Sequence, residues 1–440
     1  MAAMTAVDGT DVQVDEVEAL AVDGLRWLVS AARESADGAL AWPATPGQQE
    51  TDPTLYSGTA GIVCVLLEAW RHLGDDSYAD LALRAGRGVA AAVDGHQDDS
   101  LYFGRSGMAL VLHTLGDEFD DTACGAAADR AMALVRSRFD GERWGELFEL
   151  MGGNAGTGLA ALAVGDPEFA VLAVEPYLRA AEKTPWGVTW PHRPGTDARM
   201  HHMSHGTLGI AYALARIGRA TGRADLVDLA LAAVADVVAR DEGGPDGFLV
   251  RHSTPQFRPD VIEPISYGWC HGPAGDAQLF RLLRENPGDP AWAALVDRCL
   301  HTLVRSGLPR RLRPGFWDNN GRCCGTAGVL ALVGDLIAEG AGGQETHDFA
   351  RVLVADLAAR AVRDADGARW SNVEHRATPS DLAPRTDWAQ GSAGIVRELL
   401  RFVRLSRGGD PRYAFTWPDQ PLVSAQATEP IRRGGTDVTS

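Results

Sequence analysis

The stretch CCGTAGVLALVGDLI, residues 323–337, places a Gly-x-x-Gly motif directly before a run of residues that is apolar on nearly all sides. Such a run is typical of a helix that is buried against neighbours on both faces. Because the two glycines carry no side chain, they allow another backbone to approach the start of this helix closely. The stretch therefore predicts an inner helix that begins in a crowded turn.

The same pattern recurs along the chain, which carries seven copies of it. The shortest spacing is 46 residues, from Gly58 to Gly104, and the longest is 66 residues, from Gly206 to Gly272 and again from Gly325 to Gly391. A repeat at this scale with variable spacing indicates a repeat architecture with loops of different lengths. The first glycines of the seven copies are Gly58, Gly104, Gly153, Gly206, Gly272, Gly325 and Gly391.

Stretches of a different character lie between the copies. In residues 225–244 and 347–367, apolar residues recur at intervals of three and four, with charged residues on the opposite side. This pattern predicts outer helices that are half exposed. Seven buried helices alternating with seven amphipathic helices most economically form a closed ring, so we expect an all-α fold, an α/α toroid or double α-barrel. Tight helix packing alone is enough to explain the glycines of most copies.

Composition excludes several classes of protein. The net charge of −18 over 440 residues argues against binding to nucleic acid, which requires a basic surface. The N-terminus has no basic segment followed by an apolar core, and no apolar run reaches membrane-spanning length. We therefore expect a cytoplasmic protein without a membrane-spanning segment. We expect a single domain over residues 15–417, a disordered N-terminus at 1–14 and a disordered tail at 418–440.

Three copies carry chemically active residues just before the first glycine. The fourth copy has His205 in this place, the fifth has Cys270 and His271, and the sixth has Cys323 and Cys324. Every copy enters its inner helix at the same end of the predicted ring. We therefore expect these five side chains to converge on one mouth of the ring.

The three cysteines of this group predict a zinc site. Three thiolates and one open position form the tetrahedral arrangement that catalytic zinc uses. The alternative is that Cys270, Cys323 and Cys324 are buried small apolar residues, since free cysteine is among the most buried residue types. We adopt that alternative for Cys64 and Cys299.

These motifs resemble those of the LanC-like lanthionine cyclases. The resemblance rests on the seven Gly-x-x-Gly copies and on three stretches, residues 204–218, 268–275 and 323–329. It extends over nearly the whole chain, from about Tyr56 to Arg404. The resemblance implies a double α-barrel that contains zinc.

The resemblance also implies roles for individual residues. Cys270, Cys323 and Cys324 correspond to zinc ligands, in the version of the family with two adjacent cysteines, and His205 corresponds to a histidine proposed as acid or base. Glu149 stands where the family often has an aspartate, so it either orients a histidine or a zinc-bound group, or caps a helix.

The chain departs from the family pattern around the cysteine of the fifth copy. His271 and Ser266 replace a tyrosine and an arginine that the family often has there. His271 is therefore a second candidate acid, and the arginine's role in stabilising an enolate has no residue at Ser266. We expect His201 and His202, in a loop by the mouth, to be exposed to solvent.

The activity implied by the resemblance is addition of peptide cysteine thiols to dehydroalanine or dehydrobutyrine, which forms lanthionine or methyllanthionine rings. The partners would be a dehydrated precursor peptide and a separate dehydratase or kinase/lyase. One alternative is an enzyme that adds glutathione to dehydroamino acids, and another is a non-catalytic peptide-binding scaffold stapled by zinc. A prenyltransferase-type toroid would need a basic diphosphate pocket, for which Arg310, Arg311 and Arg313 are weak candidates.

Overall fold

The computed structural model describes residues 12–285 and 289–421. Most of the predicted disordered N-terminus and tail, residues 1–11 and 422–440, lies outside the described residues. Within the described part of the chain there are fifteen helices and eight short strands. No helix in these ranges is both long enough and apolar enough to span a bilayer.

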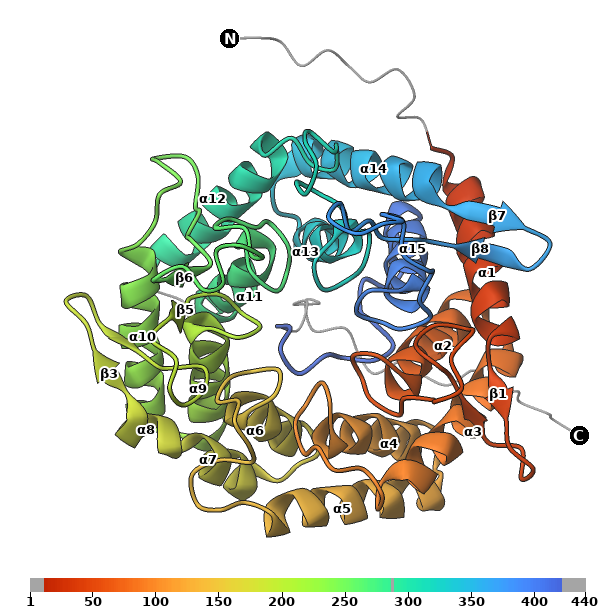
Figure 1. Ribbon diagram of the computed structural model, residues 1–440, viewed down its shortest axis with the longest axis horizontal. Coiled ribbons are helices and arrows are strands. Elements are labelled where there is room, and N and C mark those ends of the chain that lie inside the picture. Colours follow the sequence, from red (N-terminus) through yellow and green to blue (C-terminus); the bar gives the residue numbers. More distant parts are fainter. Residues whose placement is uncertain (1–11, 286–288, 422–440) are drawn as a thin grey trace, which may run out of the picture.

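Seven helices form the inner ring, and each begins immediately after the first glycine of a copy. Successive inner helices pack against one another, and the last packs against the first, so that the ring closes (Figure 1). The inner helices are α2 (Thr59–Leu73), α4 (Arg105–Phe119), α6 (Asn154–Ala163), α9 (Thr207–Thr221), α11 (Pro273–Arg284), α13 (Thr326–Ala338) and α15 (Ser392–Ser406).

The remaining helices form the outer ring; all of them except the short α8, which packs against α7, pack against an inner helix. The first outer helix, α1, packs against the last inner helix, α15, which joins the two ends of the chain (Figure 1). One outer place holds two helices, because Pro176 begins a short second helix after α7. The outer helices are α1 (Val14–Ser30), α3 (Asp76–Ala92), α5 (Thr122–Ser137), α7 (Pro167–Val174), α8 (Pro176–Ala180), α10 (Ala224–Val238), α12 (Ala291–Arg305) and α14 (Gly343–Arg360). The predicted all-α toroid is confirmed.

The strands form four two-stranded antiparallel sheets in the loops. The pairs are β1 (Arg33–Glu34) with β2 (Leu40–Ala41), β3 (Glu182–Lys183) with β4 (Val188–Thr189), β5 (Arg199–Met200) with β6 (Ser253–Thr254), and β7 (Val362–Asp364) with β8 (Gly367–Arg369). The β5–β6 pair joins the long loops that precede the fourth and fifth copies. It thereby holds the two loops together beside the chemically active residues.

A closed ring of seven backbone hydrogen bonds ties the copies together at one end of the inner helices. The residue two positions before each first glycine donates its N–H to the carbonyl of the equivalent residue in the next copy. The N···O distances are 2.9 Å from Tyr56 to Tyr102, 3.1 Å from Tyr102 to Met151, 3.3 Å from Met151 to Ser204, 3.1 Å from Ser204 to Cys270, 3.1 Å from Cys270 to Cys323, 2.9 Å from Cys323 to Ala389 and 3.2 Å from Ala389 to Tyr56. The ring places equivalent residues of all seven copies in register.

The second glycine of each copy is required by this turn. A Cβ on Gly275 would collide with the carbonyl oxygen of Trp269, and a Cβ on Gly328 would collide with that of Arg322. The same collision with the carbonyl six residues earlier recurs in all seven copies. The glycines of the motif therefore serve the turn as well as helix packing.

The chain after α15 turns into the middle of the ring (Figure 1). The Trp417 ring stacks on Trp388 with the centroids 4.3 Å apart, and the Tyr102 hydroxyl donates to Asp419 over 2.7 Å. Asp419 and Gln420 are buried. The first residues of the predicted tail, 418–421, are thus packed against the inner ring.

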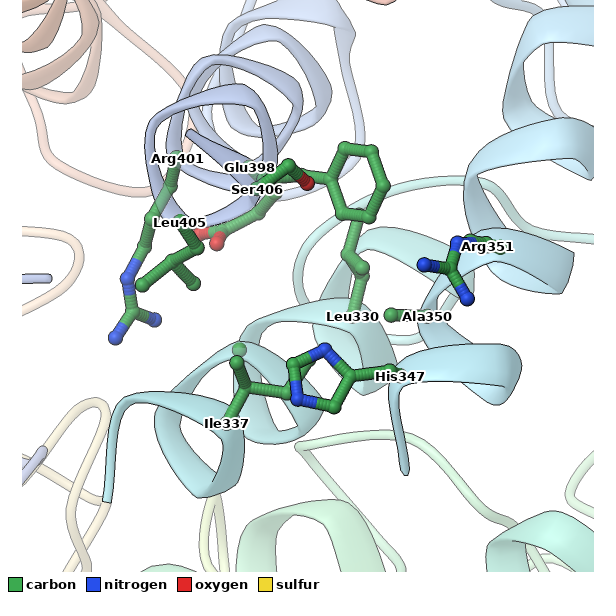
Figure 2. Close-up of a pocket in the computed structure, with 11 residues that line it drawn as sticks. Leu330, Ile337, His347, Ala350, Arg351, Glu398, Arg401, Leu405 and Ser406 are labelled. Carbon is green, nitrogen blue, oxygen red and sulfur yellow. The ribbon is translucent and has the colours of Figure 1, made fainter. Parts of the chain in front are cut away.

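A small cavity of about 40 Å³ lies between α13, α14 and α15 (Figure 2). Leu330, Ile337 and His347 line it, together with Glu398 and Arg401 of α15. None of the predicted site residues reaches this cavity. The chemically active groups lie instead in the turns before the inner helices.

Candidate metal centre

The three cysteines of the fifth and sixth copies lie together at the mouth of the ring. Cys270 precedes α11, and Cys323 and Cys324 precede α13; the Cys270 N–H donates to the Cys323 carbonyl over 3.1 Å. The Sγ of Cys324 is 3.2 Å from that of Cys270 and 3.5 Å from that of Cys323. Among the residues that the structure describes, this is the one group of three or more His, Cys, Asp and Glu side chains close enough to hold a metal ion.

The electrostatics of the cluster suit a cation. Hydrogen bonds from the thiols of Cys270 and Cys323 hold the pKa of Cys324 well below its usual value. Donation to its neighbours, together with burial, raises the pKa of Cys270 well above its usual value. The pKa of Cys323 is also raised, because Cys324 and burial outweigh the effect of Cys270. The three thiols thus cannot all ionise by themselves, whereas a bound divalent cation deprotonates its thiol ligands outright. Three soft sulfur donors are a set that fits zinc.

The other cysteines lie apart from this cluster. Cys64 and Cys299 are fully buried, as predicted, and burial raises the pKa of each. Cys124 is a buried residue of α5, and burial raises its pKa to about 12. These three thiols are therefore inert core residues.

His205 and Glu149 form a pair beside the cysteines. The Nδ1 of His205 is 3.2 Å from the Glu149 carboxylate, which is fully buried and also accepts the N–H of Gly152 over 3.0 Å. Burial would lower the pKa of His205, but the charges of Glu149 and Cys324 outweigh it and raise that pKa above its usual value. The His205 side chain keeps 30% of its surface exposed, so it faces both the site and the solvent. Glu149 thus contacts both a backbone N–H of the turn before α6 and the ring of His205.

His271 follows Cys270 and lies among other histidines, His202, His205 and His252. Its Nε2 is 3.3 Å from the Ser204 hydroxyl, and its ring centroid is 4.0 Å from that of His252. Burial, followed by the charges of the neighbouring histidines, lowers the pKa of His271 well below its usual value. At neutral pH its imidazole is therefore uncharged.

The prediction that His201 and His202 are exposed is wrong. Both side chains are fully buried, since the β5–β6 pair folds the loop of the next copy over them. The Nδ1 of His202 lies 2.8 Å from the Asp276 carboxylate of α11, and the Nε2 of His201 lies 3.0 Å from the Thr254 hydroxyl. These partners come from another copy, which sequence spacing does not reveal.

Two further residues reach the cysteines from the first and seventh copies, and sequence reasoning missed both. The Nε2 of Gln390 donates to the Sγ of Cys324 over 3.4 Å and to the Tyr56 hydroxyl over 3.1 Å. Burial, together with Cys323 and Cys324, raises the pKa of Tyr56 well above its usual value. The available signal was their place in the repeat, since Gln390 immediately precedes a first glycine and Tyr56 lies two residues before one.

An open groove of about 410 Å³ leads to the cysteines. Cys270, Cys324 and His271 lie at its inner end, and its apolar lining includes Ile265, Tyr267, Phe316 and Trp317. Its charged side chains are paired with one another. Arg313 lies 3.7 Å from Glu263, His375 lies 3.2 Å from Asp318, and Arg376 lies 3.1 Å from Glu374. The groove is therefore an extended surface in which each arginine has a carboxylate partner, and it reaches Cys270 and Cys324.

Comparisons with known proteins give one family, from a family model, and one fold, from solved structures. A family model described as "Lanthionine synthetase C-like protein" matches residues 49–255 and 258–341. No curated protein matches the sequence significantly. The solved structure of a nisin cyclase is similar over 80% of this chain and 88% of its own, with a TM-score of 0.58 at 16% identity.

A second solved structure is an inactive alpha-1,6-mannanase variant from Salegentibacter sp. HEL1_6 in complex with alpha-1,6-mannotriose. It is similar over 89% of this chain and 100% of its own, with a TM-score of 0.51 at 12% identity. At identities this low, the two similarities show a shared helical toroid and do not indicate which reaction this chain catalyses.

Proposed function

This chain belongs to the lanthionine synthetase C-like family, and on that premise we propose that it is a zinc-dependent lanthipeptide cyclase. The reaction adds the thiol of a peptide cysteine across the double bond of a dehydroalanine or dehydrobutyrine in the same peptide. A C–S bond forms at the β-carbon, and the α-carbon takes up a proton. The observation that carries the proposal is the cluster of three thiols at the end of an open groove, with a paired histidine beside it.

Cys270, Cys323 and Cys324 would hold the zinc ion, and Cys270 and Cys324 also line the groove from which a substrate thiol would approach. A zinc ion bound there would lower the pKa of a substrate thiol and so supply a thiolate at neutral pH. The backbone hydrogen bond between Cys270 and Cys323 keeps the donor set in one geometry before the metal arrives.

His205 is the proposed proton donor. Its Nδ1 faces Glu149, which leaves Nε2 to carry the proton that the α-carbon receives. Its raised pKa keeps the acid form populated near neutral pH, which a general acid requires. The exposed part of the ring allows solvent to replace the proton after each turnover.

His271 is the second candidate acid, and its lowered pKa makes it the weaker one. A neutral imidazole between Ser204 and His252 is suited to hydrogen bonding with the substrate or with His205. Ser266, which stands where the family often has an arginine, carries no positive charge that could stabilise the enolate. That charge would come from the protonated His205.

The groove is the proposed binding place of the peptide. Its dehydro residues would come from a separate dehydratase or kinase/lyase. All six cysteines are free, which suits a reducing compartment and supports a cytoplasmic location. Arg313 lies 3.7 Å from Glu263, which reduces the positive charge that the Arg310, Arg311 and Arg313 cluster could offer a diphosphate and so disfavours prenyl transfer.

The experiment that tests the proposal uses a peptide with one cysteine and one dehydrobutyrine. The zinc-loaded protein should convert it to a product of unchanged mass that iodoacetamide no longer alkylates, and the His205→Gln variant should not. A parallel reaction with a cysteine-free dehydro peptide and glutathione tests the alternative activity, which would add the mass of glutathione. If the peptide loses its alkylatable thiol no faster with the protein than in buffer alone, the proposed cyclase activity is contradicted.

A further inference from the structure

Gln390 holds a place in the seventh copy that matches Cys324 in the sixth. Each residue immediately precedes the first glycine of its copy. The Gln390 amide donates to the Sγ of Cys324 over 3.4 Å, which makes it a direct neighbour of the sulfur cluster. The proposed reaction gives this residue no role.

The direction of this hydrogen bond is fixed by a backbone group. The Gly321 N–H, which can only donate, binds the Oδ1 of Asn319 over 2.7 Å. Asn319 must then present its Nδ2 to its other partner, and that group donates to the Oε1 of Gln390. With its oxygen occupied, Gln390 presents its Nε2 to Cys324. The three amides thus form a relay that delivers an N–H to sulfur.

A branch of the relay ends at Tyr56. The Gln390 Nε2 also donates to the Tyr56 hydroxyl oxygen over 3.1 Å. The Ala389 N–H donates to the Tyr56 carbonyl, and the Cys323 N–H donates to the Ala389 carbonyl. The branch thus ties Gln390 to the turn of the first copy, and the sulfur that receives an N–H from the relay is that of Cys324.

The surroundings of Gln390 hold the relay rigidly. The backbone N–H of Gln390 donates to Asp387 over 2.7 Å, and its carbonyl accepts from Asn372 over 2.8 Å. A Cβ on Gly321 would lie 2.6 Å from the Ala389 carbonyl oxygen and 2.8 Å from the Cα of Gln390. Only glycine fits at that position, and its N–H starts the relay.

We propose that Gln390 is a positioning residue for the three cysteines, and that the relay from Gly321 through Asn319 offsets the negative charge of Cys324. The inference rests on the proposed zinc ligation by these cysteines. Three thiolates around a divalent ion leave an excess negative charge in a buried place. Hydrogen bonds to ionised groups are stronger than neutral ones, so donors aimed at sulfur stabilise that charge.

The relay also protects the ligands from the substrate. A dehydroamino acid is an electrophile, and a ligand thiolate could itself add to the β-carbon while the α-carbon takes a proton, which would inactivate the protein. The hydrogen bond from Gln390 withdraws charge from Cys324, so its sulfur becomes a weaker nucleophile. A substrate sulfur in the groove, without such donors, is then the more reactive one.

The test replaces Gln390 by methionine, which keeps the length of the side chain and removes the N–H. Zinc retention against a competing chelator should weaken by about 10–100-fold, the range typical for partners of metal ligands. In the cobalt-substituted protein, the sulfur-to-cobalt charge-transfer band should shift. Alkylation of Cys324 by iodoacetamide, mapped by mass spectrometry, should accelerate. The same change at Gln278, a buried glutamine of α11 that lies 3.4 Å from Asp335, should leave all three readouts unchanged.

A second variant separates the relay from general loss of packing. Asn319→Ala should weaken zinc retention in the same direction, and it should add nothing further in the Gln390→Met background, since both changes break one relay. Zinc retention and alkylation equal to wild type in Gln390→Met would overturn the inference, as would a full additional effect of Asn319→Ala in that background. If the wild-type protein binds no zinc at these cysteines, the proposed function fails instead.

Discussion

The turns of the second and sixth copies share one backbone and differ in their chemistry. Tyr102 and Cys323 occupy equivalent places in the ring of backbone hydrogen bonds. In the second copy, Tyr102 is buried against Trp417, and the neighbouring Phe103 packs against Tyr56 with the ring centroids 5.2 Å apart. In the sixth copy the same two places hold thiols. The repeat thus provides equivalent backbone positions at the mouth of the ring. The identity of the two residues before the first glycine determines the chemistry of each turn.

The largest effect that tests this difference is expected at Cys324. Cys324→Ser should weaken zinc retention by more than about 100-fold, beyond the loss typical of partners that only hydrogen-bond a ligand, and should abolish thioether formation. Metal analysis of the purified variant and chelator competition measure the change. Cys299→Ser is the control, because Cys299 lies in α12 away from the cluster. Full zinc content in Cys324→Ser would show that the sixth turn is not a metal site.

The next largest effect is expected in the fourth copy. His205→Gln should lower the turnover of a dehydro peptide by about 10²–10⁴-fold, the range that general acid catalysis supplies. Zinc content and melting temperature should stay near those of wild type. Unchanged turnover would assign the acid to another group, and a large loss of stability would make His205 a structural histidine.

Because all copies share one turn geometry, Gly→Ala substitutions in a copy without the cysteines and in one with them should lower the free energy of unfolding by similar amounts. Gly107→Ala in the second copy and Gly328→Ala in the sixth should each lower the free energy of unfolding by about 1–3 kcal/mol, because the added Cβ collides with a backbone carbonyl. Urea denaturation measures the change. Gly125→Ala in α5 is the control, since its Cβ would meet open space and should raise the free energy of unfolding by about 0.5–1 kcal/mol. A neutral Gly107→Ala would mean that the second turn tolerates another geometry.

The smallest expected effect concerns pH. The acid form of His205 exists below its pKa, so the rate should fall as pH rises through that pKa. Glu149→Gln removes the charge that raises the pKa, and the alkaline limb of the rate profile should move to lower pH. The contribution of the His205–Glu149 pair to the free energy of unfolding should be complete below the unfolded histidine pKa, about 6.5, and should be lost as pH rises through the raised pKa of the folded state.

An NMR titration of His205 in the wild type and in Glu149→Gln measures the pKa on which both effects depend. If the alkaline limbs of the two rate profiles coincide, Glu149 has no role in the mechanism.

Much of the fold could be predicted from the repeat. The first glycines mark the starts of all seven inner helices, because each turn needs a residue without a side chain at the same place. The prediction of fourteen helices missed the break at Pro176, which divides one outer helix in two. The pairing of β5 with β6 was also missed, because strands of two residues leave no periodic signal.

The candidate site could be predicted only in part. Cys270, Cys323 and Cys324 could be grouped by their equivalent places in the repeat, and the structure brings their sulfurs together. Exposure follows the same rule, since every residue immediately before a first glycine is partly exposed at the mouth of the ring. His201 and His202 broke the expectation, because a loop from another copy covers them.

The sequence by itself determined the seven turns, the helices that follow them and the places where side chains reach the mouth. These features depend on local backbone geometry and on the pattern of apolar residues, which both lie within one copy. Only the tertiary structure decided that Gln390 meets Tyr56, 334 residues away, and that both face the cysteines. That contact exists because α15 packs against α2 and closes the ring, so the first and last copies become neighbours. The hydrogen bonds of Gln390 with Tyr56 and Cys324 form only when the ring is closed. Residue spacing along the chain does not reveal this closure.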